Sequence, residues 1–396
     1  MSVDFTLARM PDGIVIRHSW RNLAWRQSVL DGIVAVPACD EASRIGGCLA
    51  ALAAQAPSRH GAFGVLVLVN GSTDATLRET MAHGRRESMP MWVVDVDLPR
   101  ARRDAGASRC LAVRLAMDQL ASPHGAIFTT DADSIPPRDW ITAYGELLHA
   151  GYDAVAGLTT LHADDAEDLP RSLRLREQLE RRYESCLDAL ESWFDPVAHN
   201  PWPRHYQASG ANLAMKRSCL AALADAPWPV CGEDKAMVKW LEHHDFRVRH
   251  DTSRKVLTSG RIFGRAKGGM ADTMRRRILD PHALCDDRLE AVDRACFRAR
   301  ARRVFRGWHR LGSPSASQAE SFASQLRVPA TLVTHALEHA HFGAAWASLE
   351  QSSSRLVREA LSPGQLAHQC TRGEAMLSRL SLPHLVADAE TAQVAP

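Results

Sequence analysis

A regular alternation of short apolar segments and helical segments, from Gly32 to Thr130, most constrains the fold of this chain. The expected strands are Gly32–Val36, Gly64–Val69, Trp92–Val96 and Ala126–Thr130, and the expected helices between them are Ala42–Ala54, Asp74–Met81 and Ala107–Leu120. Strands that are apolar throughout and alternate with helices are typical of a mostly parallel sheet covered on both faces. The sequence therefore predicts an α/β fold whose ligands bind beyond the carboxyl ends of the strands.

The pattern differs on either side of this stretch. The first thirty residues are polar and irregular, apart from an apolar segment at Gly13–Ile16 that fits an edge strand. After Trp140 the alternation loosens, although Leu173–Leu190 has the pattern of a charged helix. From Ala271 onward the chain is rich in arginine and is predicted to be helical. We therefore expect an N-terminal segment at 1–30, an α/β domain at 31–270 and a helical C-terminal extension at 271–396.

Composition narrows the possible classes of function. The net charge of the 396 residues is only +2, which is too small to indicate a nucleic-acid partner. No uninterrupted apolar run approaches the roughly 18 to 20 residues that cross a bilayer, and the first residues lack the pattern of a secretory signal. The nine cysteines include no C-x-x-C pair and are expected to be reduced core thiols. These features together predict a cytoplasmic protein.

The sharpest local signal is Asp131-Ala132-Asp133, which directly follows an expected strand. Two carboxylates at a strand end supply the hard oxygen ligands that a divalent cation prefers, and they leave positions open for phosphate oxygens. A D-x-D pattern is also common by chance, and Asp95-Val96-Asp97 follows another expected strand in the same chain. The motif alone therefore leaves open whether it binds metal.

Further motifs supply the context that the D-x-D pattern lacks. Five of them occur in order, at Ile33–Glu41, Leu66–Thr76, Ile127–Ser134, Ser209–Arg217 and Gly232–Asp234. Together they resemble the family 2 glycosyltransferases of GT-A fold, from about Gly32 to Arg265. The resemblance implies an enzyme that moves a sugar from a nucleotide-diphosphate donor to an acceptor hydroxyl, with Mn²⁺ or Mg²⁺ as cofactor.

The resemblance also implies roles for individual residues of the donor site. The nucleotide-binding positions are Pro37, Ala38, Asp40, Glu41, Asn70, Arg109, Asp131 and Ala132. Asp133 would be the principal metal ligand, with Asp131 near the ribose and the metal. Asn70 stands where the family usually has an aspartate that reads the base edge, and an amide oxygen accepts a ring N–H of uracil or guanine. A UDP- or GDP-sugar is therefore the expected donor. The alternative for Arg109 is an exposed residue on a helix surface.

Asp234 is the expected general base, and Glu233 is its acidic neighbour. A sugar hydroxyl is a poor nucleophile, so a carboxylate must take its proton as the new bond forms. The alternative is that both acids only cap the helix that follows them. The resemblance places the sugar and the acceptor near Gly210, Ala211 and Asn212.

A basic, glycine-containing loop follows at Thr258–Gly269. The resemblance implies that Ser259, Arg261 and Arg265 bind the diphosphate, as part of a mobile lid. The alternative is a solvated basic turn that leads into the C-terminal extension.

Other functions stay open at this point. A retaining enzyme would use the same metal site but would not use Asp234 as a base. A catalytically silent nucleotide-sugar-binding scaffold would need neither Asp133 nor Asp234. A nucleotidyltransferase is disfavoured because a Pro37–Glu41 turn replaces its usual phosphate loop.

Two C-terminal patterns have less specific interpretations. His335 and His339, close to Glu338 and His341, are expected on one helix face as a possible zinc pair, but they lack a clear third ligand. The segment Arg294–Arg310 is a basic amphipathic helix with Phe297, Ala301, Val304 and Trp308 on one side. We expect this helix to pack on the neighbouring domain with its arginines in water, while peripheral contact with an anionic membrane is the alternative.

Overall fold

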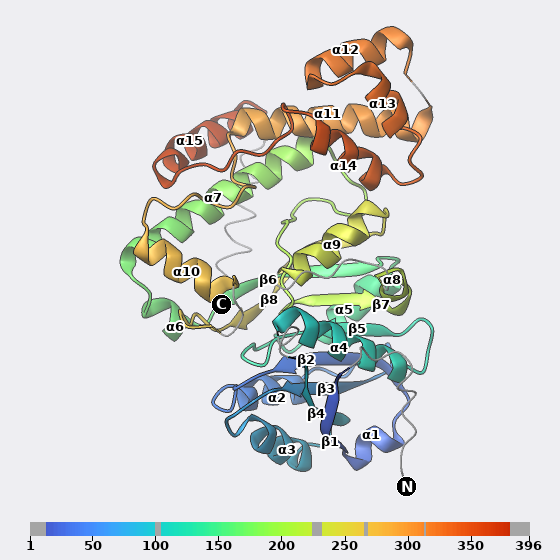
Figure 1. The fold of residues 1–396 in the computed structure, drawn as a ribbon, viewed down its shortest axis with the longest axis vertical. Helices are drawn as coiled ribbons and strands as arrows, with labels where there is room; N and C mark the ends of the chain where they lie inside the picture. The colour runs from blue at the N-terminus through green and yellow to red at the C-terminus, as the bar shows by residue number, and fades with distance from the viewer. Residues whose placement is uncertain (1–12, 100–103, 224–231, 265–267, 313, 381–396) are drawn as a thin grey trace.

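A twisted eight-stranded sheet with helices on both faces forms one half of the molecule, and a body of helices forms the other (Figure 1). The computed structural model describes residues 13–99, 104–223, 232–264, 268–312 and 314–380. The strands of the sheet are β1 (Val15–Arg21), β2 (Leu30–Ala38), β3 (Ala62–Asn70), β4 (Met91–Asp97), β5 (Ala126–Thr129), β6 (Ala154–Leu161), β7 (Leu213–Lys216) and β8 (Val248–Thr258). Their order in the sheet is β1-β4-β3-β2-β5-β7-β6-β8.

The helices that cover the sheet follow the predicted alternation. They are α1 (Leu23–Gln27), α2 (Ile45–Ala53), α3 (Thr76–Arg86), α4 (Ala105–Gln119), α5 (Trp140–His149), α8 (Arg217–Ala222) and α9 (Glu233–His243). Strands β4, β3, β2 and β5 run parallel to one another, as expected, and β1 is the expected edge strand, antiparallel to β4. Strand β7 runs antiparallel to β5 and β6, so the sheet is mixed. The α/β fold predicted from the sequence is confirmed.

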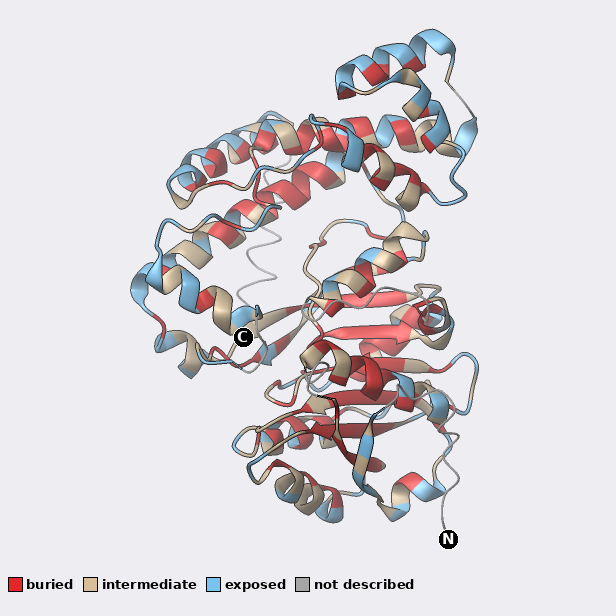
Figure 2. Cartoon of the chain, viewed as in Figure 1, coloured by how far each residue is buried: buried red, intermediate tan, exposed pale blue. Residues whose placement is uncertain are grey.

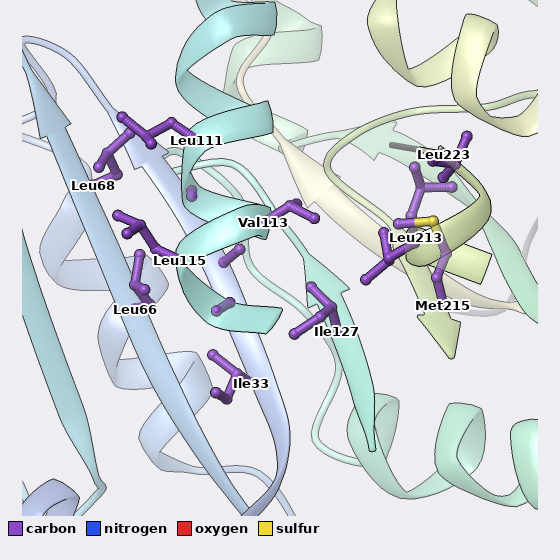
Figure 3. Close-up of a cluster of buried hydrophobic side chains, with 14 of the residues drawn as sticks. Ile33, Leu66, Leu68, Leu111, Val113, Leu115, Ile127, Leu213, Met215 and Leu223 are labelled. Carbon is purple, nitrogen blue, oxygen red and sulfur yellow. The ribbon is translucent and has the colours of Figure 1, made fainter. Parts of the chain in front are cut away.

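The core of this half has two layers, one on each face of the sheet. On one face, α4 packs on β2 and β3 through Leu111 and Leu115, which lie against Leu66 and Leu68 (Figure 3). On the other face, α2, α3 and α5 cover side chains such as Val34 and Val67. Each fully buried side chain of this size contributes about 1.5–3 kcal/mol. Burial on both faces explains why these strands are apolar throughout.

Three strands after Trp140 were not predicted. Strand β6 contains Gly157, after which its register against β8 shifts, and a Cβ atom at this position would lie 1.9 Å from the Tyr144 hydroxyl oxygen. Strand β8 carries His250 and Asp251 in its first half, and both are buried. A glycine and internal charged residues hide the apolar pattern of a strand, although the buried polar groups bond within the protein.

The helical body contains α6 (Ala163–Glu167), α7 (Arg171–Phe194), α10 (Met270–Leu279), α11 (Val292–Leu311), α12 (Ala316–Leu326), α13 (Ala330–Ala336), α14 (Phe342–Ser352) and α15 (Pro363–Arg379). The helices expected after Ala271 are present. The buried face of α7, including Leu187 and Leu190, packs against α11 and α15 (Figure 2). One hydrophobic core thus includes residues from both sides of the expected boundary at residue 270.

Helix α11 differs in part from its prediction. Phe305 is fully buried and Val304 is 45% exposed, so the apolar stripe is centred on Phe305. Several arginines of this helix are paired rather than solvated: Arg298 is buried against Glu290, and Arg306 pairs with Asp195 at the end of α7. The prediction that the arginines lie in water is wrong for these positions, because Glu290 just before α11 and Asp195 at the end of α7 supply carboxylates. Across the described residues, no helix combines the length and apolar character needed to cross a membrane.

Candidate active site

The predicted site residues meet at the carboxyl ends of β2, β3 and β5. Pro37 and Ala38 end β2, Asn70 ends β3, and Asp131 follows β5 by two residues. Ligands of open α/β sheets bind at this edge. Because β7 pairs antiparallel with β5, with Leu213 opposite Thr129, the residues before β7 lie beside those after β5. The topology therefore brings the segment before Leu213 next to the D-x-D motif.

The D-x-D motif forms a tight turn after β5. The Ser134 N–H donates to the Asp131 carbonyl oxygen at 3.1 Å. Ala132 is buried in the apolar core, while the Asp131 and Asp133 side chains are 36% and 9% exposed. Burial, together with the Asp131 carboxylate, raises the pKa of Asp133 to about 6. The two carboxylates therefore lie close enough to repel each other, and a positive charge beside them lowers that repulsion.

Arg261 supplies a positive charge to this site. Its guanidinium donates to both oxygens of Glu41, at 2.8 and 2.6 Å, and lies 3.2 Å from an oxygen of Asp133. Glu41 is buried, and its backbone N–H donates to Thr76 Oγ1 at 2.7 Å. The predicted diphosphate-binding arginine therefore lies beside the predicted metal ligands and pairs with carboxylates there, while Phe263 and Gly264, further along the loop, are exposed.

Asp165 holds the loop that carries Arg261. Its carboxylate accepts two hydrogen bonds from Arg44, at 3.0 and 3.1 Å, and one from the Gly260 N–H at 2.8 Å. The hydrogen bonds from Arg44 hold the pKa of Asp165 below its usual range. Ser259 is buried in this loop, and its hydroxyl accepts from the Arg261 N–H at 3.2 Å. No motif pointed to Asp165 or Arg44, and Arg265 lies outside the described residues.

Arg109 connects three parts of the site. Its side chain is 6% exposed and donates to Asp131 Oδ1 at 2.6 Å, to Glu233 Oε1 at 3.0 Å and to the Gly210 carbonyl at 2.9 Å. Burial alone would lower the pKa of Arg109, but the carboxylates of Asp131 and Glu233 outweigh burial and raise it. The alternative of an exposed helix residue is wrong, because α4 lies against the sheet at this position.

Gly210 is where the backbone meets this arginine. A Cβ atom at Gly210 would lie 2.2 Å from Arg109 Cζ, so only glycine fits. The Gly210 carbonyl also accepts from Thr129 Oγ1 at 2.7 Å, and the Gly210 N–H donates to Asp234 Oδ2 at 2.9 Å. The predicted base is thereby tied to the same segment as the D-x-D motif.

Asp234 lies in the first turn of α9, and its other oxygen accepts from the Lys235 N–H at 2.8 Å. The residue at the N-cap is Gly232, with φ of +76°, and no side chain caps the helix. Glu233 is buried and faces Arg109. Asp234 thus accepts a first-turn N–H of α9 and also the N–H of Gly210, so the capping role and the predicted role as a base stay compatible.

The nucleotide-binding loop after β2 is fixed by the turn after β3. Asp40 has a positive φ of 50°, and its Oδ1 accepts from the Thr73 N–H at 2.6 Å and the Asp74 N–H at 3.2 Å. Asn70 is buried; its amide donates to Ser108 Oγ at 2.9 Å and accepts from the Leu98 N–H at 3.2 Å. Both ends of this amide are already bonded, so its reading of a base edge stays a prediction.

Asn212 has a different environment from Gly210 and Ala211. Its side chain is fully buried, accepts from Trp140 Nε1 at 2.8 Å, and donates to the carbonyls of Leu158 and Arg254 at 2.7 and 2.9 Å. The amide therefore joins α5, β6 and β8. The Asn212 side chain cannot contact a sugar or an acceptor without losing these bonds. The predicted contact of this segment with sugar or acceptor would therefore involve the backbone of Gly210 and Ala211.

The two C-terminal patterns lie away from this edge of the sheet. His335 and Glu338 are exposed and contact each other at 2.9 Å. Among the described residues, no three His, Cys, Asp or Glu side chains are arranged to hold a metal ion by themselves.

Comparison with known proteins agrees with the motifs. Residues 33–202 match the family described as glycosyl transferase family 2. No curated protein sequence matches the chain. The chain is similar in structure to TarS of S. aureus in complex with UDP, at 15% identity and a TM-score of 0.40, covering 78% of this chain and 80% of that one. It is also similar to the mannosyltransferase PcManGT of Pyrobaculum calidifontis, in complex with GDP-Man and Mn²⁺, at 16% identity and a TM-score of 0.42, covering 91% and 86%.

The family match identifies the class of protein. Residues 33–202, less than half of the chain, match glycosyl transferase family 2, and this match supports a transferase enzyme that uses a nucleotide-sugar donor. The structural likenesses are too low in identity and TM-score to add anything about substrate. The resemblance predicted from the motifs is confirmed.

Proposed function

We propose that this protein transfers a sugar from a UDP- or GDP-linked donor to an acceptor hydroxyl with inversion at the anomeric carbon. Asp234 takes the proton of the acceptor hydroxyl, and Asp131 and Asp133 hold a divalent cation at the donor diphosphate. Arg261 and Ser259 bind the diphosphate itself. The cytoplasmic location predicted from the sequence is part of this proposal.

One observation supports the proposal most strongly: the predicted base and the predicted metal site belong to one bonded cluster. Asp234 accepts from the N–H of Gly210, the carbonyl of Gly210 accepts from Arg109, and Arg109 donates to Asp131. The segments involved are far apart in sequence, yet only a few bonds separate the carboxylates. The acceptor oxygen attacks the sugar carbon that is bonded to the diphosphate. The base that takes the proton of this oxygen must therefore lie close to the metal and diphosphate site.

The donor set fits a divalent cation of the magnesium type. Asp131 and Asp133 offer hard oxygen ligands, and such ions are commonly held by one or two carboxylates plus substrate phosphates. When bound, the cation would stabilise the negative charge that develops on the leaving diphosphate.

Arg261 has a second role in this proposal. Without a donor its guanidinium neutralises Glu41 and Asp133. A bidentate guanidinium also matches the geometry of phosphate oxygens. Arg261 would thus be able to contact either Asp133 or a donor diphosphate, and a bound cation would supply the charge that Asp133 needs in the second case.

Binding of nucleotide sugars with Mn²⁺ or Mg²⁺ tests the proposal. A ligand at about 100 times its Kd stabilises the native state by about 2.7 kcal/mol, which a thermal-shift screen detects. We expect a UDP- or GDP-sugar to raise the melting temperature only with the metal, and Asp133→Ala to lose that metal-dependent increase. Asp164→Ala, at an exposed position on α6, is the matched control. An equal metal-dependent increase for Asp133→Ala would contradict the metal site.

A further inference from the structure

The ion pair between Arg44 and Asp165 joins the turn after β2 to the short helix α6. Its two side chains are 33% and 20% exposed, and the guanidinium donates to both oxygens of the carboxylate. Ion pairs at this level of exposure usually contribute little, unless they are bidentate or belong to a network. This pair meets both conditions, because Asp165 also accepts a hydrogen bond from the Gly260 N–H at 2.8 Å. Its effect therefore extends to the loop that carries Arg261.

The turn that carries Arg44 also carries the acid that binds Arg261. The N–H groups of Arg44 and Ile45 donate to the Glu41 carbonyl oxygen, at 3.0 and 2.9 Å. The Glu41 carboxylate in turn accepts two hydrogen bonds from the guanidinium of Arg261. One tight turn thus supplies a carboxylate to the head group of Arg261 and a guanidinium to Asp165.

The contact of Asp165 with the loop is close enough to fix the backbone next to Arg261. A Cβ atom at Gly260 would lie 2.9 Å from Asp165 Cβ and 3.3 Å from the Asp165 carbonyl oxygen, so a larger residue does not fit without movement. None of the five residues of α6 is buried. Hydrogen bonds of Asp165, rather than burial of apolar side chains, therefore connect α6 to the loop.

Together these contacts form a closed ring that includes Arg261. One half of the ring runs from the Arg261 guanidinium to Glu41 and along the turn to Arg44. The other half runs from Arg44 through Asp165 to the Gly260 N–H, and so back to the loop. The ring holds both the backbone and the head group of Arg261 beside the predicted metal ligands. A side chain that is already held loses less conformational freedom when it binds a ligand.

The alternative is that Arg44 contacts the donor phosphates itself. Both terminal nitrogens of its guanidinium donate to Asp165 in the structure. A phosphate bound by these nitrogens would leave Asp165 without its counter-charge and would open the ring. The geometry therefore favours an action of Arg44 through the loop over a direct contact.

We propose that Arg44 and Asp165 are positioning residues for the donor diphosphate, which hold the backbone at Gly260 so that Arg261 lies ready beside the metal ligands. The proposal rests on the proposed function, in which Arg261 binds the diphosphate. Neither positioning residue touches the donor. A nucleoside diphosphate should therefore bind less tightly when the ion pair is broken, even though Arg261 and the metal ligands are intact.

Calorimetric titration of the full chain with UDP and with GDP, each in the presence of Mn²⁺, tests the proposal. We expect Asp165→Ala and Arg44→Gln each to weaken binding about tenfold, since each removes hydrogen bonds between charged groups. Arg44→Lys keeps the charge but not the bidentate geometry, and it should recover part of the affinity. Asp164→Ala and Arg85→Gln, at exposed positions of α6 and α3, should bind as wild type.

Double variants separate positioning from direct contact. The variant with both Arg44→Gln and Asp165→Ala should bind as Asp165→Ala alone does, within about threefold, because residues that act through one group are not additive. Asp165→Ala should likewise change affinity little when it is added to Arg261→Gln. A further tenfold loss in the first double variant would place Arg44 on the diphosphate, and one in the second would show that Asp165 acts without Arg261. Either result would overturn the proposal.

Urea denaturation separates these roles from a purely structural one. If Asp165→Ala does not fold, Asp165→Asn takes its place, since it keeps the size of the side chain and one acceptor oxygen. A variant that is less stable but binds the diphosphate as wild type does would show that the pair only fixes α6, and would overturn the proposal while leaving the proposed function intact. If the wild type binds neither UDP nor GDP, the proposed donor site fails and the positioning roles fail with it.

Discussion

Arg109 joins the D-x-D turn, the Gly210 segment and the first turn of α9 through one guanidinium group. Its three bonds, to Asp131, Gly210 and Glu233, are between 2.6 and 3.0 Å long. Each partner comes from a different part of the chain, so the arginine sets the spacing between the predicted metal ligands and the predicted base. A buried cation of this kind is costly to disturb, because its partners would remain buried without a counter-charge.

Gly210→Ala tests this arrangement without removing any charged group. Its Cβ atom would lie 2.2 Å from Arg109 Cζ, so either the arginine or the segment must shift. We expect a loss of about 1–3 kcal/mol in the free energy of unfolding, as for other overpacked sites, measured by urea denaturation. Gly307→Ala in α11 has open space and should stabilise the helix by up to about 1 kcal/mol. Equal stability of Gly210→Ala and wild type would show that Arg109 is free to move.

The residues that the sequence identified are those that a motif places at a strand or helix end. Asp131, Asp133 and Asp234 could be predicted because position on a strand or helix decides where a short acidic side chain lies. Asn212 has the right position in its motif, but its amide is used inside the fold, between Trp140 and two backbone carbonyls. The groups that bond the Asn212 amide come from α5, β6 and β8, and a single sequence does not show which of these segments meet in the fold.

The Thr258–Arg261 loop carries Ser259 and Arg261, the two residues that we propose bind the donor diphosphate. An antiparallel bridge between Ile135 and Leu257 brings it beside the D-x-D turn. Asp165 of the short helix α6 then holds the loop through the N–H of Gly260. The loop was predicted from its composition, but its partners were not, because strands β6 and β8 are hidden by a glycine and by buried charged residues.

Arg261→Gln tests the role of this loop. In the absence of donor, Glu41 and Asp133 would lose their counter-charge, so we expect about 1–3 kcal/mol lower stability in urea denaturation. Affinity for the nucleoside diphosphate should also fall, as measured by calorimetry. Arg276→Gln, at an exposed position of α10, serves as the control. A variant as stable as wild type, with unchanged diphosphate affinity, would contradict both roles of Arg261.

At the scale of the whole molecule, α9 connects the active site to the helical body. Its first turn carries Asp234, and beyond its last turn Asp245 accepts hydrogen bonds from the N–H groups of Phe342 and Gly343, at 2.7 and 3.0 Å. These two residues begin α14. Helix α7 makes a second connection, because its apolar face belongs to the core of the helical body while other side chains of this helix line a small cavity together with β6 and β8.

Because α7 and α9 each contact both the sheet and the helical body, we predict that the two halves of the molecule unfold together. Leu187 of α7 is 1% exposed, so Leu187→Ala should lower the free energy of unfolding by about 2–5 kcal/mol. Leu175→Ala, at a position of the same helix that is 54% exposed, should have little effect. Calorimetry should show one cooperative transition in each protein. Two separate transitions, with only one of them lowered by Leu187→Ala, would show that the expected boundary at residue 270 divides independent domains.

Single-turnover sugar transfer by Asp234→Asn tests the central claim most directly, once a donor has been found. The asparagine keeps the size of the side chain but cannot take a proton, so we expect transfer to fall by several orders of magnitude while donor and metal affinity stay near wild type. Asp118→Asn, at an exposed position of α4, should transfer as fast as wild type. A rate for Asp234→Asn within about tenfold of wild type, a barrier change of only ~1.4 kcal/mol, would contradict the assignment of Asp234 as the base.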